Sequence, residues 1–555
     1  MKLLKKLFIG VFAFLIIAIT AFYFIVKVKT PDVELDSISK IERNSISDSV
    51  FYSGNSWLKK NKLGLYEMYI EGNAFESGYT NGLLSKKLVQ NQEKIFVERL
   101  KEMLPSIVYT HFLKYFVAFF NRNLDESIDP EYLKEIYGVS LSFSDDYLYI
   151  GPKFYRILNY HAAHDIGHAL QNMNLVACTS VGMWGKKTSD SSMLIGRNFD
   201  FYMGEEFAKD KIVLFLKPDS GYKFMSVTWG GMIGVVSGMN EHGLTITLNA
   251  SKSSIPNAAA TPVSIIARKI LQYASNIDEA YRIANQYKSF VAESFMIGSK
   301  EDGRVAIIEK SPEKTTLFET TENMITCSNH FQGKEWITDE LNIANIKESP
   351  TEHRRKRLVE LIEAKPKLDY LDLAKVLRNP YGAGEKDFGM GNEKAMNQYV
   401  AHHSIIFNPT KGIVWVSTNP YQLGAFVAYD LNKIFNQKAS KNLSEDISEP
   451  ALLIAPDSFL VKREYQDLQF HKTMTERIRK IIRTEDGEIN KSEIKHYQQS
   501  NPNYFHTWMM LGDYYFAKKQ KKEAISSYKK ALSLDIPRIN DSLALAERII
   551  ECKKL

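Results

Sequence analysis

Short β-rich runs alternate with helical stretches between Leu175 and Tyr429, and this alternation is the strongest constraint on the fold. Turn signals such as Glu241-His242-Gly243 separate the runs. Strands come first, helices follow and strands return, which predicts a layered α+β fold rather than a regular βαβ series. The expected strands are 193–195, 212–216, 224–228, 244–248, 305–309, 405–407 and 413–417, and the expected helices are 261–275, 278–286, 354–364 and 370–377.

The chain has 555 residues, which is too long for a single hydrophobic core. Its composition changes at several points, and these changes predict five segments. We expect a transmembrane anchor or signal at 1–30, a mostly helical segment at 31–177 that begins with a polar connector over 31–60, an α+β domain at 178–436, a linker at 437–465, and a helical region at 466–555.

The N-terminus reads as a membrane segment. Three lysines, the last of them Lys6, precede an uninterrupted apolar run from Leu7 to Val26, long enough for the roughly 30 Å core of a bilayer. A cleaved signal peptide is the alternative, but its apolar region is usually about 7–15 residues and ends in small residues. The lysines before the span favour a cytoplasmic N-terminus. We therefore expect a membrane-anchored protein whose body is exported to the periplasmic or extracellular side.

The C-terminal region carries one tetratricopeptide-like pattern. Trp508-x-x-Leu511-Gly512-x-x-Tyr515 is followed by Ala524, Tyr528 and Ala531. A protein partner for this region is one expectation, and an amphipathic helical hairpin without a binding role is the other.

Charge and cysteine content exclude some classes. The formal charge is only +6 over 63.6 kDa and no basic run forms a stripe, so we expect no nucleic-acid partner. The three cysteines, Cys178, Cys327 and Cys552, form no disulfide framework. A free thiol in an exported protein is explained by burial or by catalysis.

Cys178 lies where the helical half of the chain meets the β-rich half. Arg197 and Asp200 follow after a turn at 187–192, a spacing that suits a β-hairpin returning both side chains to the cysteine. A nearby guanidinium lowers the pKa of a thiol. If the bond between Ala177 and Cys178 is cut, the new α-amino group can accept the thiol proton, and no histidine is needed.

Several segments together resemble one family. Cys178-Thr179-Ser180 with Gly196-Arg197-Asn198-x-Asp200 is similar to the acyl-coenzyme A:isopenicillin N acyltransferase family and, more distantly, to choloylglycine hydrolases and penicillin V acylases. The further segments that carry the resemblance are Gly72–Gly82, Gly238–Asn249, Cys327–Phe331, Ser349–Leu358 and Ser404–Ser417.

The resemblance implies a four-layer αββα N-terminal-nucleophile hydrolase fold, matured by autocleavage. It implies Cys178 as nucleophile, Arg197 beside the thiolate and Asp200 near the new amino group. Asn329 would donate to the oxyanion, with Asn249 as a second polar contact, and Arg354 is a further site residue for which Arg355 and Arg357 compete. The expected substrate is an N-acyl amide, and no cofactor or metal is expected.

Two other functions stay open from the sequence. His161, His164 and His168 are spaced three and four residues apart, so that they would share one face if the segment is helical and could hold the metal of a hydrolase, although Asp165 stands where a zinc protease has its glutamate. The chain could also be a non-catalytic scaffold that acts through its tetratricopeptide-like region.

Overall fold

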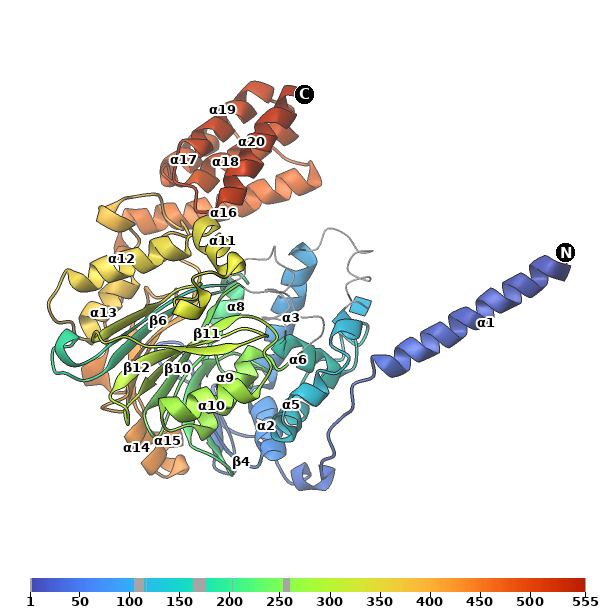
Figure 1. Cartoon of the computed structure of the whole chain (residues 1–555), viewed down its shortest axis with the longest axis vertical. Helices are drawn as coiled ribbons and strands as arrows, with labels where there is room; N and C mark the ends of the chain where they lie inside the picture. The colour runs from blue at the N-terminus through green and yellow to red at the C-terminus, as the bar shows by residue number, and fades with distance from the viewer. Residues whose placement is uncertain are drawn as a thin grey trace.

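The computed structural model describes residues 2–103, 114–115, 117–162, 176–201, 203–252 and 260–554. Two β-sheets lie face to face at its centre (Figure 1). Phe215 and Met296 from the larger sheet share one buried cluster with Ile405 and Val416 from the smaller sheet. These side chains form the layer between the sheets.

The larger sheet has the strand order β1-β2-β3-β4-β7-β8-β9-β10-β11-β12-β13, and the smaller sheet has the order β14-β5-β6-β15-β16-β17. Strands β4 and β7 are parallel, and the other pairs of neighbouring strands in the two sheets, as far as the structure describes them, are antiparallel. The strands of the larger sheet are β1 (Asn44–Ser47), β2 (Val50–Ser53), β3 (Ser56–Lys60), β4 (Tyr66–Gly72), β7 (Ile212–Pro218), β8 (Phe224–Thr228), β9 (Ser237–Asn240), β10 (Leu244–Ala250), β11 (Glu293–Ser299), β12 (Arg304–Lys310) and β13 (Thr315–Phe318). Those of the smaller sheet are β5 (Val176–Met183), β6 (Leu194–Phe201), β14 (Met324–Cys327), β15 (Ala401–Asn408), β16 (Ile413–Ser417) and β17 (Phe426–Asp430).

Helices cover the outer face of each sheet. Helices α9 (Val263–Tyr273) and α10 (Ile277–Gln286) pack on the larger sheet, where Ile270 joins the cluster of Ile246. Helices α12 (Thr351–Glu363) and α13 (Tyr370–Leu377) pack on the smaller sheet through residues such as Leu373. The predicted four-layer αββα fold is therefore confirmed.

Two glycines of the family-like motifs allow the helices to approach the sheets closely. A Cβ atom on Gly196 of β6 would lie 2.9 Å from the Leu373 side chain, and one on Gly238 of β9 would lie 2.5 Å from that of Leu271. Asn240 then ties the sheet to α9, because its Nδ2 donates to the carbonyls of Leu271 and Ala274. These motif positions hold the layers together.

The region before Cys178 differs from the prediction. Residues 44–72 form strands β1 to β4, where the sequence indicated a polar connector followed by mostly helical chain. Strand β4 pairs in parallel with β7, which follows it by some 140 residues, and its Glu67 is buried against Tyr429 and Lys59. A local pattern does not indicate this strand, because its partner is distant in the sequence and a charged residue lies inside it.

The helical part of that region packs on the same layers. Helices α2 (Ala74–Leu84) and α5 (Pro130–Ser140) touch through glycines, since a Cβ on Gly78 would lie 2.0 Å from the Glu135 carbonyl oxygen. Helix α3 (Lys86–Met103) joins α6 (Lys153–His161) through a buried ion pair between Glu93 and Arg156.

The expected linker at 437–465 is ordered against the smaller sheet. Its backbone bridges β17 at Phe426↔Ile454 and Tyr429↔Ser448, and Ile447 and Ile454 are buried.

Other short helices in the described residues are α8 (Glu205–Lys209), α11 (Glu340–Glu348), α14 (Leu431–Asn436) and α15 (Ala439–Ser444).

Five helices, the first of which begins at Arg463 at the end of this segment, stack at the top of the view in Figure 1. In α18, Gly512 lies against the Tyr528 ring of α19. A Cβ at Gly512 would lie 2.4 Å from that ring, so the pattern's small and large residues form this helix contact. The five helices are α16 (Arg463–Thr484), α17 (Lys491–Ser500), α18 (Phe505–Ala517), α19 (Lys521–Leu532) and α20 (Ile539–Lys554).

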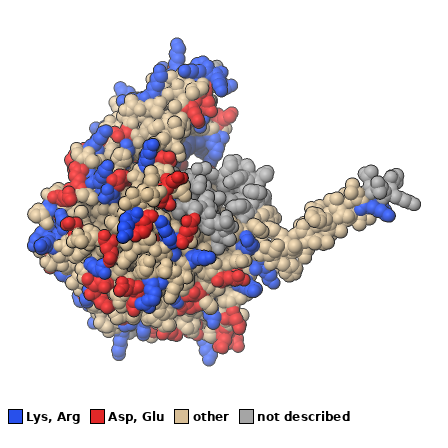
Figure 2. Space-filling model, viewed as in Figure 1, with Lys and Arg blue, Asp and Glu red and all other residues tan. Residues whose placement is uncertain are grey.

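Helix α1 (Lys2–Ile25) projects away from the body (Figure 1), and its surface is uncharged along most of its length (Figure 2). The span Lys5–Ile25 is exposed and is apolar and long enough to cross a bilayer. A helix of this kind at an N-terminus fits either a membrane anchor or a signal sequence.

Candidate active site

Strands β5 and β6 form the predicted hairpin around Cys178. Ala177 lies opposite Asp200, Cys178 opposite Phe199, and Ser180 opposite Arg197. The hairpin therefore brings Arg197 back to the face that carries Cys178, while Asp200 lies opposite the preceding residue, Ala177, on the neighbouring strand.

Cys178 and Arg197 are in direct contact. Arg197 Nη2 lies 3.3 Å from the Cys178 sulfur, and the same nitrogen donates to the Leu248 carbonyl. Both side chains are fully buried. Burial raises the pKa of the Cys178 thiol to about 12, while the Arg197 charge acts to lower it. In the uncut chain the sulfur is therefore a protonated thiol at neutral pH.

Asp200 is fully buried beside the bond that cleavage would break. Gln398 Nε2 donates to its Oδ2 at 3.1 Å, while its Oδ1 has no hydrogen-bond partner among the described residues. Burial raises the pKa of Asp200 to about 7, and the charges of Arg354 and Arg197 oppose this shift. The carboxyl can therefore exchange a proton near neutral pH.

Asn329 reaches the backbone of the cysteine. Its Oδ1 accepts the Cys178 N–H at 3.0 Å and a hydrogen bond from Arg354 Nη2, and its Nδ2 donates to the Ala250 carbonyl at 2.9 Å. The amide expected to donate to an oxyanion is thus engaged with a backbone carbonyl in the uncut chain.

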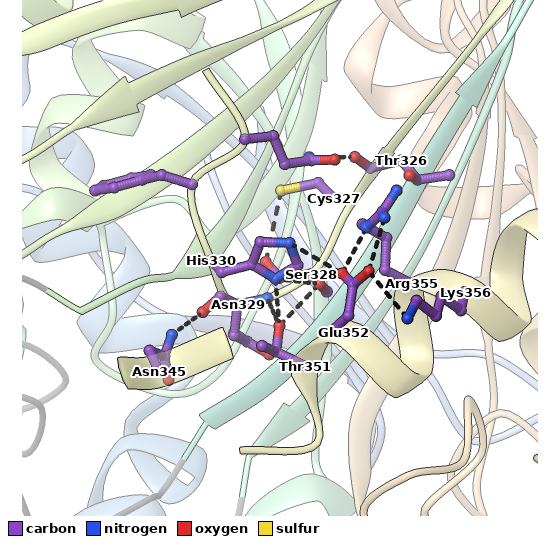
Figure 3. Close-up of polar contacts among 12 residues, drawn as sticks. Thr326, Cys327, Ser328, Asn329, His330, Asn345, Thr351, Glu352, Arg355 and Lys356 are labelled. Carbon is purple, nitrogen blue, oxygen red and sulfur yellow. Dashed lines mark hydrogen bonds and ion pairs between the residues drawn. The ribbon is translucent and has the colours of Figure 1, made fainter. Parts of the chain in front are cut away.

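The backbone of Asn329 is held on both sides, as Figure 3 shows. Its N–H donates to Thr351 Oγ1 at 2.7 Å, and Asn345 Nδ2 donates to its carbonyl at 2.5 Å. Thr351 also donates to Ser328 Oγ. Thr351, two residues after the Ser349 of the family-like motif, is therefore the residue that contacts the Asn329 backbone.

The three arginines of α12 that compete for one predicted role have different partners. Arg354 Nε donates to Thr179 Oγ1 at 3.1 Å and its Nη1 to the Glu393 carbonyl. Arg355 pairs with Glu352, and Arg357 with Glu360 and Glu385. Of the three, Arg354 is the one placed beside Cys178's strand.

Asn249 lies on β10, across from β5. Its Oδ1 accepts from Ser180 Oγ at 2.7 Å, and its Nδ2 donates to the Cys327 carbonyl at 3.4 Å. It is therefore adjacent to the cysteine's strand without touching the sulfur.

A buried polar chain behind Arg197 was not predicted. Arg197 Nη1 donates to Ser237 Oγ, which lies 2.9 Å from His403 Nε2, and His403 Nδ1 lies 2.9 Å from His402 Nδ1. The direction of the Ser237–His403 hydrogen bond and that of the His403–His402 hydrogen bond depend on which ring nitrogens carry the protons. His402 Nε2 has no hydrogen-bond partner among the described residues. The pKa of both histidines lies well below its usual value because both are buried, so both rings are neutral.

The histidines of the metal alternative are only partly described. His161 is buried, with Nδ1 against the Ile157 carbonyl and Nε2 accepting from the Ile233 N–H. Both ring nitrogens are thus used by backbone groups. His164 and His168 lie outside the described residues. Among the described residues no group of three or more His, Cys, Asp or Glu side chains could hold a metal ion.

Sequence comparison identifies the region that contains most of these residues. Residues 186–423 match the family model described as acyl-coenzyme A:6-aminopenicillanic acid acyl-transferase. The predicted family resemblance is confirmed. The match begins after Cys178 and includes Arg197, Asp200, Asn249 and Arg354. It supports amide-bond acyl transfer or hydrolysis as the class of chemistry.

The C-terminal prediction is also confirmed. Residues 505–535 match the tetratricopeptide repeat family, and they cover α18 and α19.

Two curated proteins share part of the chain. An uncharacterized protein of Archaeoglobus fulgidus is 28% identical over 273 residues, which are 45% of this chain and 44% of that protein. Protein dcd1B of Dictyostelium discoideum is 23% identical over 275 residues, which are 47% of this chain and 52% of that protein. The chain thus spans about half the length of the curated relatives it matches.

The chain also has a distant likeness to a solved structure. A mutant of the conjugated bile acid hydrolase from Clostridium perfringens is 15% identical, with a TM-score of 0.32, and the match covers 49% of this chain and 95% of that chain.

Proposed function

We propose that the protein is a cysteine-dependent N-terminal-nucleophile amidohydrolase or acyltransferase, matured by autocleavage between Ala177 and Cys178. The observation that carries the proposal is the 3.3 Å contact between Arg197 Nη2 and the Cys178 sulfur, with Asp200 opposite Ala177 in the same hairpin. A thiol and a cation are in contact, and a carboxyl of raised pKa lies on the neighbouring strand.

Maturation would begin with the Cys178 sulfur. The sulfur adds to the Ala177 carbonyl carbon, the C–N bond breaks, and the thiol proton ends on the new α-amino group of Cys178. Asp200 can pass that proton, because its pKa lies near 7. Water then hydrolyses the thioester, which leaves a carboxylate on Ala177 and restores the thiol.

The cut supplies the base that the uncut chain lacks. A free α-amino group has a pKa near 7.7–8.0, far closer to neutral pH than the buried thiol. Asn329 Oδ1 already accepts from the Cys178 nitrogen, and Asp200 Oδ1 has an open acceptor position nearby in the hairpin. These two oxygens would orient the amine toward the sulfur, so that it accepts the thiol proton.

Catalysis would repeat the same chemistry on a substrate. The thiolate attacks the carbonyl of an N-acyl amide, the amine group leaves with a proton, and water or a second amine takes the acyl group. Arg197 stabilises the thiolate, and Asn329 and Asn249 are the proposed oxyanion contacts. Donors of this kind commonly contribute about 10²–10³ in rate.

Location follows from α1 in the same proposal. We take α1 as a membrane anchor with the hydrolase domain exported. In the same proposal, residues 31–177 precede the cut, residues 178–436 form the catalytic domain, and residues 466–555 follow the segment 437–465. Coenzyme A thioesters belong to the cytosol, so export favours hydrolysis over transfer from such a donor. The tetratricopeptide match supports a protein partner for the C-terminal helices.

Intact-mass analysis tests the proposal. The purified protein should yield a fragment that begins at Cys178, and Cys178→Ala should abolish it. Cys552→Ala, which alters another buried free thiol, is the matched control and should cleave normally. A single uncut chain that nonetheless hydrolyses amides, or cleavage that persists in Cys178→Ala, would refute the proposal. A panel of N-acyl amino acids, β-lactams and bile-acid conjugates would then define the substrate.

A further inference from the structure

One irregular stretch of chain, residues 387–399, contacts both the candidate active site and the C-terminal helices. It contains neither a helix nor a strand, yet Met396, Asn397 and Gln398 are almost completely buried. A buried stretch without its own hydrogen-bond ladder takes its position from its neighbours. Those neighbours are therefore informative.

The first set of contacts leads to the site. Gln398 Nε2 donates to Asp200 Oδ2 at 3.1 Å, and the Met396 carbonyl accepts from Asn198 Nδ2 at 2.9 Å. The Glu393 carbonyl accepts from Arg354 Nη1 at 3.1 Å. The 387–399 segment thus holds two of the proposed site residues directly.

The second set leads to the C-terminal helices. The Asn501 side chain makes two hydrogen bonds to the backbone of Met390, accepting from its N–H at 2.9 Å and donating to its carbonyl at 2.8 Å. Asn392 Nδ2 donates to the Asp535 carbonyl at 2.9 Å. Gly389 has φ +85° and lies so close to Tyr504 that a Cβ would be 2.4 Å from its backbone nitrogen.

Two ion pairs reinforce this contact. Arg538 Nη2 lies 2.5 Å from Glu393 Oε2, and Lys394 lies 3.2 Å from Asp535. The side chains of Arg538 and Glu393 are only 16% and 23% exposed, so solvent screens this pair less than a surface pair. Glu393 therefore joins the two regions, since its carboxylate pairs with the C-terminal helices and its carbonyl with Arg354.

We infer that the C-terminal helical region is a positioning element of the catalytic site. By holding the 387–399 segment, it fixes Gln398 against Asp200 and the Glu393 carbonyl against Arg354. The inference rests on the proposed function for its catalytic consequence, whereas the mechanical link stands on the contacts alone. The region that matches tetratricopeptide repeats would then support the catalytic site, in addition to any contact that it makes with a protein partner.

A charge exchange in the full-length protein tests the link. Arg538→Glu and Glu393→Arg should each slow formation of the Cys178 fragment by about tenfold to a hundredfold, because small displacements of catalytic groups have effects of that size. The double variant should recover most of the rate. Arg477→Glu is the control, because Arg477 pairs with Glu493 inside the C-terminal region.

Two further measurements separate positioning from a general loss of folding. Each single variant should move the pH midpoint of cleavage, because the hydrogen bond from Gln398 to Asp200 changes. Amide hydrogen exchange over 395–401 should accelerate in the single variants and return to normal in the double variant. Asn501→Ala, which leaves the charge unchanged, should reproduce both effects.

The outcomes distinguish the two proposals. If the unaltered protein cleaves and the variants match Arg477→Glu in rate and exchange, the positioning role is wrong and the proposed function stands. If the unaltered protein never cleaves but exchange over 395–401 responds to the charge exchange, the link is supported and the proposed function fails.

Discussion

Arg197 contacts the Cys178 sulfur with one nitrogen and Ser237 with another, so a single buried guanidinium joins the thiol to a polar chain behind it. The planar fork of an arginine can make such contacts at once, which a lysine cannot do. This geometry leads to the first two predictions.

Arg197→Met should raise the pH at which iodoacetamide alkylates Cys178 in the cleaved protein, because the cation that lowers the thiol pKa is lost. Amide hydrolysis should fall by about 10²–10³. Arg268→Met is the matched control, since Arg268 is equally buried but pairs with Glu135. An unchanged alkylation profile in Arg197→Met would show that the guanidinium does not act on the thiol.

Ser237→Ala and His403→Ala should each slow cleavage, because Ser237 is the link between His403 and Arg197. The two substitutions remove the same hydrogen bond. The loss of rate in the double variant should therefore be much smaller than the product of the two single losses. Rates from a double-mutant cycle measure this. Fully multiplicative effects would mean that the two residues act separately.

Asp200 should make the stability of the uncut chain depend on pH. Its pKa is raised from 3.8 to about 7 in the folded protein, so between about pH 4 and 7 the folded state binds more protons than the unfolded state. Stability must therefore fall as pH rises through this window, by at most about 4 kcal/mol.

Asp200→Asn, placed in Cys178→Ala so that the chain stays uncut, should flatten this slope. Chemical denaturation at pH 4.5 and pH 7.5 gives the comparison with Cys178→Ala alone. If the free energy of unfolding changes with pH equally in the two proteins, the pKa of the Asp200 carboxyl is not raised in the folded protein.

Gly512→Ala should destabilise the C-terminal helices. Alanine would favour an exposed helix by about 1 kcal/mol over glycine. Here, however, its Cβ would lie 2.4 Å from the buried Tyr528 ring, and overpacking of this kind costs about 1–3 kcal/mol. Hydrogen exchange of α18 and α19 should rise in the variant, and slower exchange would contradict the prediction.

Local patterns in the sequence predicted many of the strands and helices after Cys178, although not strands such as β11 and β17, and they predicted the hairpin that returns Arg197 to Cys178. They did so because a hairpin places residues by spacing alone, and β5 and β6 are neighbours in the chain. The order of strand and helix runs along the chain likewise indicated a layered α+β fold.

The tertiary structure decided what depends on residues far apart in sequence. Strand β4 pairs with β7, which is distant in the sequence. Gln398 donates a hydrogen bond to Asp200, 198 positions away, and Asn501 binds the backbone of Met390, 111 positions away. No local pattern records such contacts, because each residue's own neighbours leave the position of its distant partner undetermined. The sequence by itself therefore determined the hairpin that carries the thiol, and only the folded chain determined what surrounds and holds it.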